Sequence, residues 1–384
     1  MRLAVLCDAL YPYGQGGRET LHFERSTRLA RRGHAVRVHT VHWWPEDSSE
    51  IVLDGVVVSA ITGRRSTYTA EGRRSRRHVL LFSLSSLRLL WSPAFDVLDV
   101  DQFPYLHILV ARVVCSLRRR PMTVTWHEVW DLNTWRSRAG FIGHVGYALQ
   151  RWGARSADLV FANSALTATR LSTWLGVDPR RIVILPPSGV ETVRDREPAP
   201  KTIDCIFIGR LLPHTHVDLL LKAVAGLPGV TAAIVGGGPD RDRLASLASD
   251  LGILGRVSFE SHGTRDSVLA RLRSARLFTY PSTREGFGTA VLEANACGIP
   301  ALIVKHADNA AVEIVRDGEN GLVCGLDPNQ IATSIRQFLD DPAAQARLSR
   351  AARSVASAYS WENYVTRMLG SLHSLIRAEA RQAA

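Results

Sequence analysis

Several features are scarce or missing in this chain of 384 residues, and each absence narrows the class of protein. The cysteines are few, odd in number and without metal-ligand spacing, which argues against a zinc site or a disulfide framework and favours free thiols in a reducing compartment. No apolar run reaches the roughly 18 residues of a membrane-spanning helix, because Arg112 and Arg118 interrupt the best candidate. The start, Met1 to Asp8, turns polar too early for a signal peptide, so we expect a cytoplasmic protein. The five cysteines are Cys7, Cys115, Cys205, Cys297 and Cys324.

A complete dinucleotide-binding fingerprint is also missing. The loop from Tyr11 to Glu19 is glycine-rich, but Thr20 stands where a Gly-x-Gly-x-x-Gly motif would place its last glycine. The next expected strand ends at Val38 to Val41 without the acidic residue that would bind a ribose. We therefore exclude a nicotinamide-dependent oxidoreductase.

Charge is unevenly distributed, with a formal net charge of +11. Two arginine clusters fall in the first half, one of them just before the leucine-rich segment Val79 to Trp91. Such clusters are either a solvated surface or a contact for a membrane surface or a phosphorylated acceptor. Nucleic acid is not expected, because no recognition motif accompanies them. The clusters are Arg64, Arg65, Arg73, Arg74, Arg76 and Arg77, and then Arg118, Arg119 and Arg120.

Hydrophobic content of 46% and a length beyond one ordinary core predict a globular α/β protein with two domains. Strand-like runs alternate with helical stretches throughout, which predicts parallel sheets with crossover helices. A charged, proline-bearing stretch without apolar period, 191–202, is the predicted linker between residues 1–190 and 203–364. The expected strands lie near 2–7, 35–41, 55–60, 97–100, 122–126, 158–161 and 182–185, and near 203–208, 231–235, 256–259, 276–280, 300–304 and 322–324.

The segment from Pro281 to Ala294 is the most informative in the chain. It follows an expected strand, so it lies at the carboxyl edge of a sheet, where open α/β folds bind ligands. Its glycines allow close backbone approach, and the free amides at the start of the next helix attract phosphate. Glu285 precedes this helix and Glu293 lies about two turns into it. Carboxylates at these positions suit the hydroxyl groups of a sugar.

This segment resembles the Glu-x7-Glu motif of retaining glycosyltransferases of the GT-B architecture, in particular family four. The resemblance continues in Ala294 to Pro300, with its small-residue helix end and Gly-x-Pro, and in the Asp-Gly-x-Asn-Gly turn of Val315 to Leu322. It implies two Rossmann-like domains that face each other across a cleft. It also implies a final helix, from about 365 to 384 after Tyr359-Ser360-Trp361-Glu362, that returns to the N-terminal, acceptor-side domain. No metal ion or other cofactor is implied.

The resemblance assigns roles in the first domain. Gly16 and Gly17 correspond to the double glycine beside the phosphates of the donor and the acceptor, although a structural turn is the alternative. Thr125-x-His127 matches a Thr-x-His whose histidine contacts the donor sugar, whereas a histidine at a strand end is otherwise a structural residue. Glu128 either binds acceptor or caps the next segment. Trp130 suits a sugar ring as well as core packing.

The second domain carries the donor site in this resemblance. Arg210 of Gly-Arg-Leu corresponds to the arginine that binds diphosphate, which fits its planar fork. The turn around Gly237 lies near the nucleotide, and Gly286, Phe287, Gly288 and Thr289 supply amides to the phosphates. The stretch Lys305 to Ala311 ranks lower, because Asp308 or Asn309 suits a helix cap. The chain departs from the family at Thr215, where a lysine is usual; His214, His216 or Arg284 are substitutes, whereas Lys222 lies too far into the next helix.

The expected function is retaining, metal-independent transfer of a sugar from a nucleoside diphosphate sugar to an acceptor hydroxyl. Glu285, His127 and Arg210 form the catalytic set, and Glu293 binds the ribose. The alternatives are a GT-B nucleotide-sugar epimerase, a phosphorylase-like enzyme, or a non-catalytic glycosyltransferase-like subunit. The expected partners are the donor, an acceptor, and the inner membrane face through the arginine-rich first domain.

Overall fold

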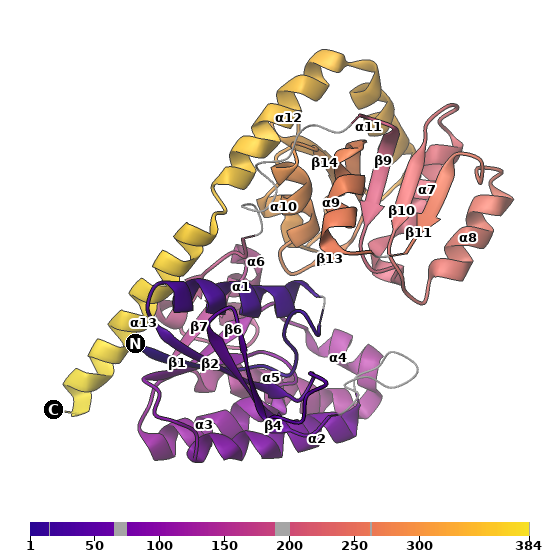
Figure 1. Cartoon of the computed structure of the whole chain (residues 1–384). Coiled ribbons are helices and arrows are strands. Elements are labelled where there is room, and N and C mark those ends of the chain that lie inside the picture. The colour runs from indigo at the N-terminus through magenta and orange to yellow at the C-terminus, as the bar shows by residue number, and fades with distance from the viewer. Residues whose placement is uncertain (15, 65–74, 189–199, 262, 384) are drawn as a thin grey trace. The chain divides into compact units, whose positions relative to one another are not determined.

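The computed structural model describes residues 1–14, 16–64, 75–188, 200–261 and 263–383 (Figure 1). The chain divides into two compact units. Unit 1 comprises Met1–Pro186 and Glu362–Ala384, and unit 2 comprises Pro187–Trp361. The sequence places the return to the first domain at about residue 365, and the structure places it at Glu362. Most of the predicted linker, 191–199, lies outside the described residues.

The sheet of unit 1 has eight strands in the order β3-β4-β2-β1-β5-β6-β7-β8. All neighbours pair in parallel except β3, which pairs antiparallel with β4 at the edge. The sequence missed β3, because its residues alternate between half-buried and exposed and lack the continuous apolar run of a central strand. The strands are β1 Arg2–Leu6, β2 Ala35–Val41, β3 Glu50–Leu53, β4 Val56–Thr62, β5 Val97–Asp101, β6 Met122–Trp126, β7 Leu159–Ala162 and β8 Ile182–Ile184.

Helices cover both faces of this sheet, as crossover connections between parallel strands require. The last helix, α13, lies beside the end of the first helix, α1: its Glu362 pairs with Arg32, directly after α1, and its His373 contacts His34 in the following turn (Figure 1). The helices are α1 Gly17–Arg31, α2 Arg76–Ser85, α3 Leu106–Arg118, α4 Leu132–Ala139, α5 Gly143–Ser156, α6 Ala165–Thr173 and α13 Trp361–Ala383, with 3-10 turns η1 Ser86–Leu90, η2 Gly140–Ile142 and η3 Pro179–Arg181.

Unit 2 is built on a six-stranded parallel sheet in the order β11-β10-β9-β12-β14-β16. Two very short strands, β13 and β15, pair with each other beyond it. The strands are β9 Ile203–Ile208, β10 Ala232–Val235, β11 Val257–Glu260, β12 Ala275–Tyr280, β13 Arg284–Glu285, β14 Ala301–Val304, β15 Asp308–Asn309 and β16 Gly321–Cys324. The helices are α7 Val217–Ala225, α8 Arg241–Asp250, α9 Arg265–Arg273, α10 Thr289–Ala296, α11 Pro328–Asp340 and α12 Pro342–Ser357, with turns η4 Pro213–Thr215 and η5 Ala310–Glu313.

The central strands are buried on both faces, which is why their sequences read as apolar runs. Strand β5 is completely buried although it contains Asp99 and Asp101. Buried acids at a strand end need partners, because an isolated charge away from water is unfavourable. The carboxyl ends of β1, β5 and β6 meet at one edge of unit 1, and those of β9, β10 and β12 meet at one edge of unit 2.

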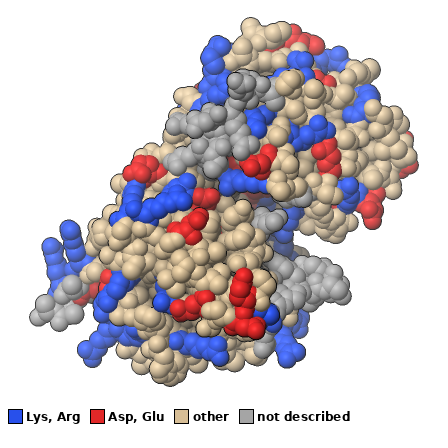
Figure 2. Space-filling model, viewed as in Figure 1, with Lys and Arg blue, Asp and Glu red and all other residues tan. Residues whose placement is uncertain are grey.

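Three general features of the chain are its hydropathy, its surface charge and its cysteines. No described helix combines the length and apolar character needed to cross a membrane. Lysine and arginine are spread over both units on the face shown in Figure 2, rather than gathered in one patch. All five cysteines are free thiols. Burial raises the pKa of Cys115, Cys205 and Cys297 to about 12, so these thiols stay protonated at neutral pH.

Candidate active site

The loop after β12 holds Glu285 in a fixed orientation. Tyr280, the last residue of β12, donates its hydroxyl hydrogen bond to Glu285 Oε1 at 2.5 Å. The Tyr280 ring is itself fixed, because it stacks on Phe207 and Phe278 with centroids 5.4 Å away in each case. Burial and the neighbouring Glu285 charge raise the pKa of Tyr280 well above its usual value. Tyr280 therefore remains a donor, and it aims the Glu285 carboxylate.

A second support comes from the loop after β14. Strand β13 pairs with β15 so that Glu285 lies opposite Asn309. The buried Asn309 amide donates to the carbonyls of Ser282 and Val304, each at 3.0 Å, and its oxygen accepts from Ala311 N. Asn309 thus caps η5, as the sequence suggested, and also joins the two loops that carry the site.

The start of α10 presents backbone amides. Gly288 precedes the helix with φ +100°, and a Cβ there would lie 3.0 Å from Ala311 Cβ, so only glycine fits without strain. No side chain caps the helix, which leaves amides of its first turn available to an anion. Thr289 is the first helical residue, and Gly286 is half-buried beside Glu285. The Phe287 side chain is buried and packs on Tyr359, so only its backbone is placed for a ligand.

Glu293 lies just past the first turn of α10, not two turns deep, because residues 286–288 stay outside the helix. Its carboxylate is 25% exposed and lies 3.4 Å from the Arg265 guanidinium. Burial raises the pKa of Glu293, and Arg265 opposes this only in part. A hydroxyl group that donates a hydrogen bond to this carboxylate would stabilise its charged form.

Two glycine loops meet beside β9. A Cβ on Gly236 would lie 1.9 Å from the Gly209 carbonyl oxygen, and one on Gly238 would lie 2.2 Å from the Leu211 carbonyl oxygen, with φ near +150° at both. Gly237, between them, has no protein atom within 4 Å of that position. The Arg210 side chain is exposed, and its charge is close enough to lower the pKa of Tyr280 in part. Among the described residues it has no hydrogen-bond partner, which leaves its guanidinium for an oxyanion.

In unit 1, His127 follows β6 and is held from several sides. Its Nε2 lies 2.9 Å from Asp101 Oδ1, at the end of β5. Gln102 accepts from the backbone N–H of His127, and Asn163 donates to its carbonyl. Burial would raise the pKa of Asp101, but Arg18, His22 and His127 together hold it well below its usual value. An ionised Asp101 accepts the Nε2 hydrogen, and the tautomer with its hydrogen on Nε2 has Nδ1 as its acceptor.

Two arginines complete a buried ionic network around this histidine. Arg18 donates to Asp101 Oδ2 at 2.5 Å and lies 3.2 Å from Asp8. Arg25, fully buried in α1, pairs with Asp99 and donates to Thr125 Oγ1 at 2.8 Å. The threonine of Thr125-x-His127 is therefore part of the support for β5 and β6.

The other predicted residues of unit 1 are placed as follows. Gly16 and Gly17 are exposed at the start of α1, and a Cβ on Gly16 would lie 2.2 Å from the Glu19 carboxylate. Glu128 is half-buried, and its carbonyl accepts from Trp126 and Gln102. Trp130 is half-buried in an aromatic cluster with Phe103 and Trp135, below the Arg138 guanidinium. Trp126 is wholly buried in the core.

Comparison with known proteins explains this arrangement. The family model for glycosyltransferase family 4 matches residues 15–194, and that for glycosyl transferases group 1 matches residues 190–355. The chain belongs to the family-four type of GT-B glycosyltransferases. Together the two models span residues of both units, and they include the predicted site residues described above in each unit.

Relatives and solved structures agree with this family. A D-inositol 3-phosphate glycosyltransferase of Mycolicibacterium paratuberculosis is 36% identical over 239 residues, which cover 58% of this chain and 54% of that protein. Another from Acidothermus cellulolyticus is 34% identical over 254 residues, covering 60% and 56%. The chain thus spans about half the length of these curated relatives.

Solved GT-B structures match nearly the whole chain. HepE of Anabaena in complex with UDP has a TM-score of 0.77 at 19% identity, covering 97% of this chain and all of that one. Sucrose-phosphate synthase of Thermosynechococcus elongatus has a TM-score of 0.81 at 19% identity, covering 98% and 99%. At this identity the likeness shows the fold.

The family's lysine position is occupied by a structural residue. Thr215 is buried in η4, and its hydroxyl donates to the Leu212 carbonyl at 2.7 Å. His216, half-buried with φ +49°, has a pKa lowered mainly by burial. Lys222 pairs with Asp218. Arg284 is half-buried in β13, whereas Arg210 is exposed and has no hydrogen-bond partner among the described residues.

One cluster in unit 1 has ligand atoms close enough for a metal ion: His22, Asp101 and His127. Its surroundings oppose one. Arg25 donates to His22 Nδ1 at 2.6 Å, so the neutral ring carries its hydrogen on Nε2, the atom that would have to coordinate. Histidine ligands of metals instead donate their second N–H to an acceptor. Arg18 already neutralises Asp101, so the cluster is an ionic and hydrogen-bonding support.

Sequence reasoning missed the residues that orient the predicted ones: Tyr280 for Glu285, and Asp101, Arg18 and His22 for His127. One signal was visible, because Asp99 and Asp101 end an otherwise apolar strand. Nothing in the sequence distinguishes Tyr280 from an ordinary core aromatic.

Proposed function

We propose that this protein transfers a sugar from a nucleoside diphosphate sugar to an acceptor hydroxyl, with retention of anomeric configuration and without a metal ion. The observation that carries the proposal is Glu285 oriented by Tyr280 beside the uncapped start of α10. A carboxylate for sugar hydroxyls and amides for phosphate thus lie in one loop. HepE of Anabaena, whose fold this chain shares, forms complexes with UDP and with UDP-glucose, which supports a nucleotide-sugar donor.

Each part of the site then has a role. Arg210 and the amides of residues 286–289 stabilise the departing diphosphate, Glu285 positions the sugar, and Glu293 binds the ribose. His127 accepts a hydrogen bond from a sugar hydroxyl through Nδ1. Gly16, Gly17 and Gly237 allow close approach of the donor, while Glu128 and Trp130 contribute to the acceptor side.

Ligand-dependent thermal stabilisation tests the donor. A ligand that binds only the folded protein raises its stability, by about 2.7 kcal/mol at one hundred times Kd. A panel of nucleoside diphosphates and their sugars is expected to give a selective rise in Tm that Arg210→Ala abolishes. Arg276→Ala is the matched control. Arg276 pairs with Asp204 near the amino ends of β12 and β9, at the other end of these strands from the proposed donor site. If no member of the panel raises Tm, the result would contradict the proposal and favour a non-catalytic subunit. The buried Thr215, which stands where the family has a lysine, would then explain the loss of donor binding.

Turnover separates transfer from the other enzyme activities. Glu285→Gln is expected to lower turnover by about a hundredfold or more, the scale of losing a group that stabilises a transition state. Glu319→Gln, at an exposed position of the same unit, is the control. Product analysis by NMR would show the anomeric configuration; an epimerised donor without an acceptor product would instead identify an epimerase, and phosphate-dependent sugar release a phosphorylase-like enzyme.

The proposal includes a cytoplasmic location and a peripheral contact of unit 1 with an anionic membrane. Five free thiols support a reducing compartment. Arg64, Arg76, Arg77, Arg119 and Arg120 are exposed and Arg118 is half-buried, whereas Arg65, Arg73 and Arg74 lie outside the described residues.

A further inference from the structure

The hairpin formed by α4 and α5, Leu132–Ser156, has a tip that is unusually apolar for a protein surface. Phe141 is 87% exposed, Ile142 50% and Val145 55%. Trp152, 47% exposed, stands seven residues after Val145 and therefore on the same face of α5. A row of large apolar groups on one helix face marks an interaction surface rather than a scatter of single exposed residues.

This tip is rigid. Trp135 of α4 packs directly onto α5, where a Cβ on Gly146 would lie 2.3 Å from its ring and one on Gly143 would lie 2.4 Å from its carbonyl oxygen. Asp131 caps α4 by accepting from Thr134 N at 2.8 Å. Gly140 makes the turn between the helices with φ +57°. Phe141 is thus carried by a turn whose backbone is fixed on both sides, which limits the ordering that binding requires to the side chain itself.

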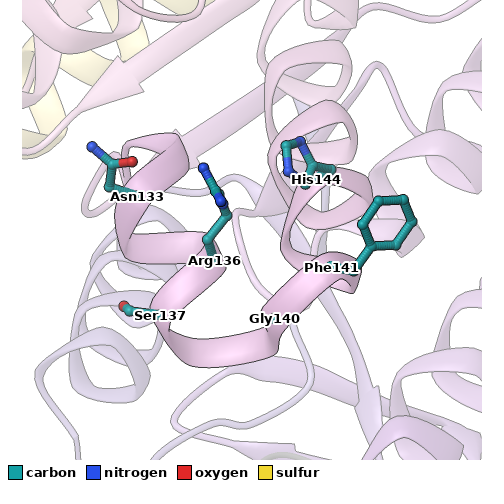
Figure 3. Close-up of a pocket in the computed structure, with 6 residues that line it drawn as sticks. All are labelled: Asn133, Arg136, Ser137, Gly140, Phe141 and His144. Atoms are coloured by element: carbon teal, nitrogen blue, oxygen red, sulfur yellow. The ribbon is translucent and has the colours of Figure 1, made fainter.

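A pocket of about 520 Å³ opens beside the tip. Figure 3 shows Arg136 of α4 and His144 of α5 at the gap between the helices, with the Phe141 ring beside His144. Asn133, Ser137, Gly140 and Phe141 complete the lining, and Phe141 is at the same time largely exposed. Among the described residues, the Arg136 guanidinium has no hydrogen-bond or ion-pair partner. The pocket therefore offers a cation and polar groups to an anion.

The charge of the hairpin is of one sign. Residues 132–157 contain no aspartate or glutamate, and their charged residues are Arg136, Arg138, Arg151 and Arg155. The flanking acids are engaged, Asp131 as a cap and Asp158 with Arg112. An apolar stripe within a purely basic surface is the pattern of elements that lie in the interface of an anionic bilayer.

We propose that the α4–α5 hairpin docks on an anionic membrane surface, with Phe141, Ile142 and Val145 inserted among the lipids and a headgroup phosphate held by Arg136 in the pocket. This assigns the membrane contact to a surface separate from the predicted arginine clusters, and it holds whether or not the sugar-transfer proposal is correct. A second apolar surface, with Leu80, Leu84 and Trp91, lies on α2 and just after η1. There Arg88 and Arg118 are held by backbone carbonyls, whereas Arg76 and Arg77 of α2 are exposed, so this surface serves as the comparison in the test below.

Flotation of the full chain with vesicles tests the proposal. Vesicles of phosphatidylcholine with phosphatidylglycerol are expected to carry the protein, whereas phosphatidylcholine alone carries much less, and added salt weakens the binding. Phe141→Ser with Val145→Ser should reduce binding at least about tenfold, through lost apolar burial. Arg136→Gln should reduce it about fivefold, the equivalent of about 1 kcal/mol per basic group.

Leu80→Ser with Leu84→Ser on α2 is the matched control and should leave binding unchanged. Circular dichroism and Tm establish that each variant is folded. Binding that survives the hairpin variants, or that is lost only in the α2 variant, would overturn the proposal. Thermal stabilisation by inorganic phosphate that depends on Arg136, without vesicle binding, would show a site for a soluble phosphorylated ligand instead.

Discussion

At the scale of single residues, the site depends on partners that set the direction of its hydrogen bonds. Tyr280 gives Glu285 one orientation, and Asp101 gives His127 one tautomer. Both partners are buried, so each is held by packing as well as by charge. Substitution of these buried titratable groups should change the free energy of unfolding in a way that depends on pH, because their pKa values differ from the ordinary ones.

Asp101→Asn should destabilise the protein by about 3 kcal/mol at neutral pH, the usual cost of removing one partner of a buried ion pair. The depressed pKa of Asp101 contributes stability that is present above the ordinary aspartate value, about 3.9, and is lost as pH falls below it. Urea denaturation at several pH values should therefore show the difference from the natural protein shrinking below about pH 4. Asp47→Asn, fully exposed beside Arg64, is the control. A difference that stays constant through this range would show that Asp101 is not ionised.

Glu293→Gln should make the protein more stable at neutral pH, yet weaken donor binding. The pKa of Glu293 is raised by burial, so its protonated form is favoured and stability falls as pH rises through the folded-state pKa. Glutamine removes that loss, and the gain in Tm should vanish below the ordinary glutamate value of about 4.3. Loss of a charged acceptor should weaken nucleotide-sugar binding about tenfold or more by calorimetry. A variant that binds donor as well as the natural protein would remove Glu293 from the site.

At the scale of elements, short strands and loops hold the side chains of the candidate site in position. Strands β13 and β15 have two residues each, too few for stability alone, and Asn309 joins them to the main sheet. The sequence marked Asn309 as a cap, which it is, but its link between the loops after β12 and β14 depends on the order of the strands.

Asn309→Ala should cost about 3 kcal/mol of stability, because it leaves two buried carbonyls and one amide without partners. Donor binding should fall as well, since the register that holds Glu285 is lost. Urea denaturation and calorimetric titration measure the two effects. Asn329→Ala, exposed on α11, is the control. Full stability with normal binding would show that Asn309 does not hold the loop.

At the scale of the whole molecule, the chain order and the folded units differ. Helix α13 follows unit 2 in sequence but packs on unit 1, where Tyr364, Val365, Met368 and Leu372 are buried. Tyr364 lies beside Arg25, so the last helix also covers the buried network below His127. Unit 1 is therefore complete only with α13.

Met368→Ala should destabilise unit 1 by about 2–5 kcal/mol and leave unit 2 unchanged, as expected for a buried methionine. Hydrogen exchange read by mass spectrometry should increase in peptides of β1, β5 and β6. Leu348→Ala on α12 is the reciprocal variant, because Leu348 is buried in the core of unit 2. Increased exchange in unit 2 after Met368→Ala would contradict the assignment of α13.

The sequence by itself determined most of the succession of strands and helices and the position of Glu285 and Arg210 relative to them. Apolar runs and glycine turns are local patterns, so they can be recognised without knowing the fold. The antiparallel edge strand β3, the burial of Phe287 and the entry of Glu293 into α10 were decided by packing. So were the contacts of Arg18 with Asp101, 83 residues apart, and of Asn309 with Ser282, 27 residues apart. Such pairs form because a parallel sheet gathers the carboxyl ends of distant strands at one edge, and no local pattern records which strands become neighbours.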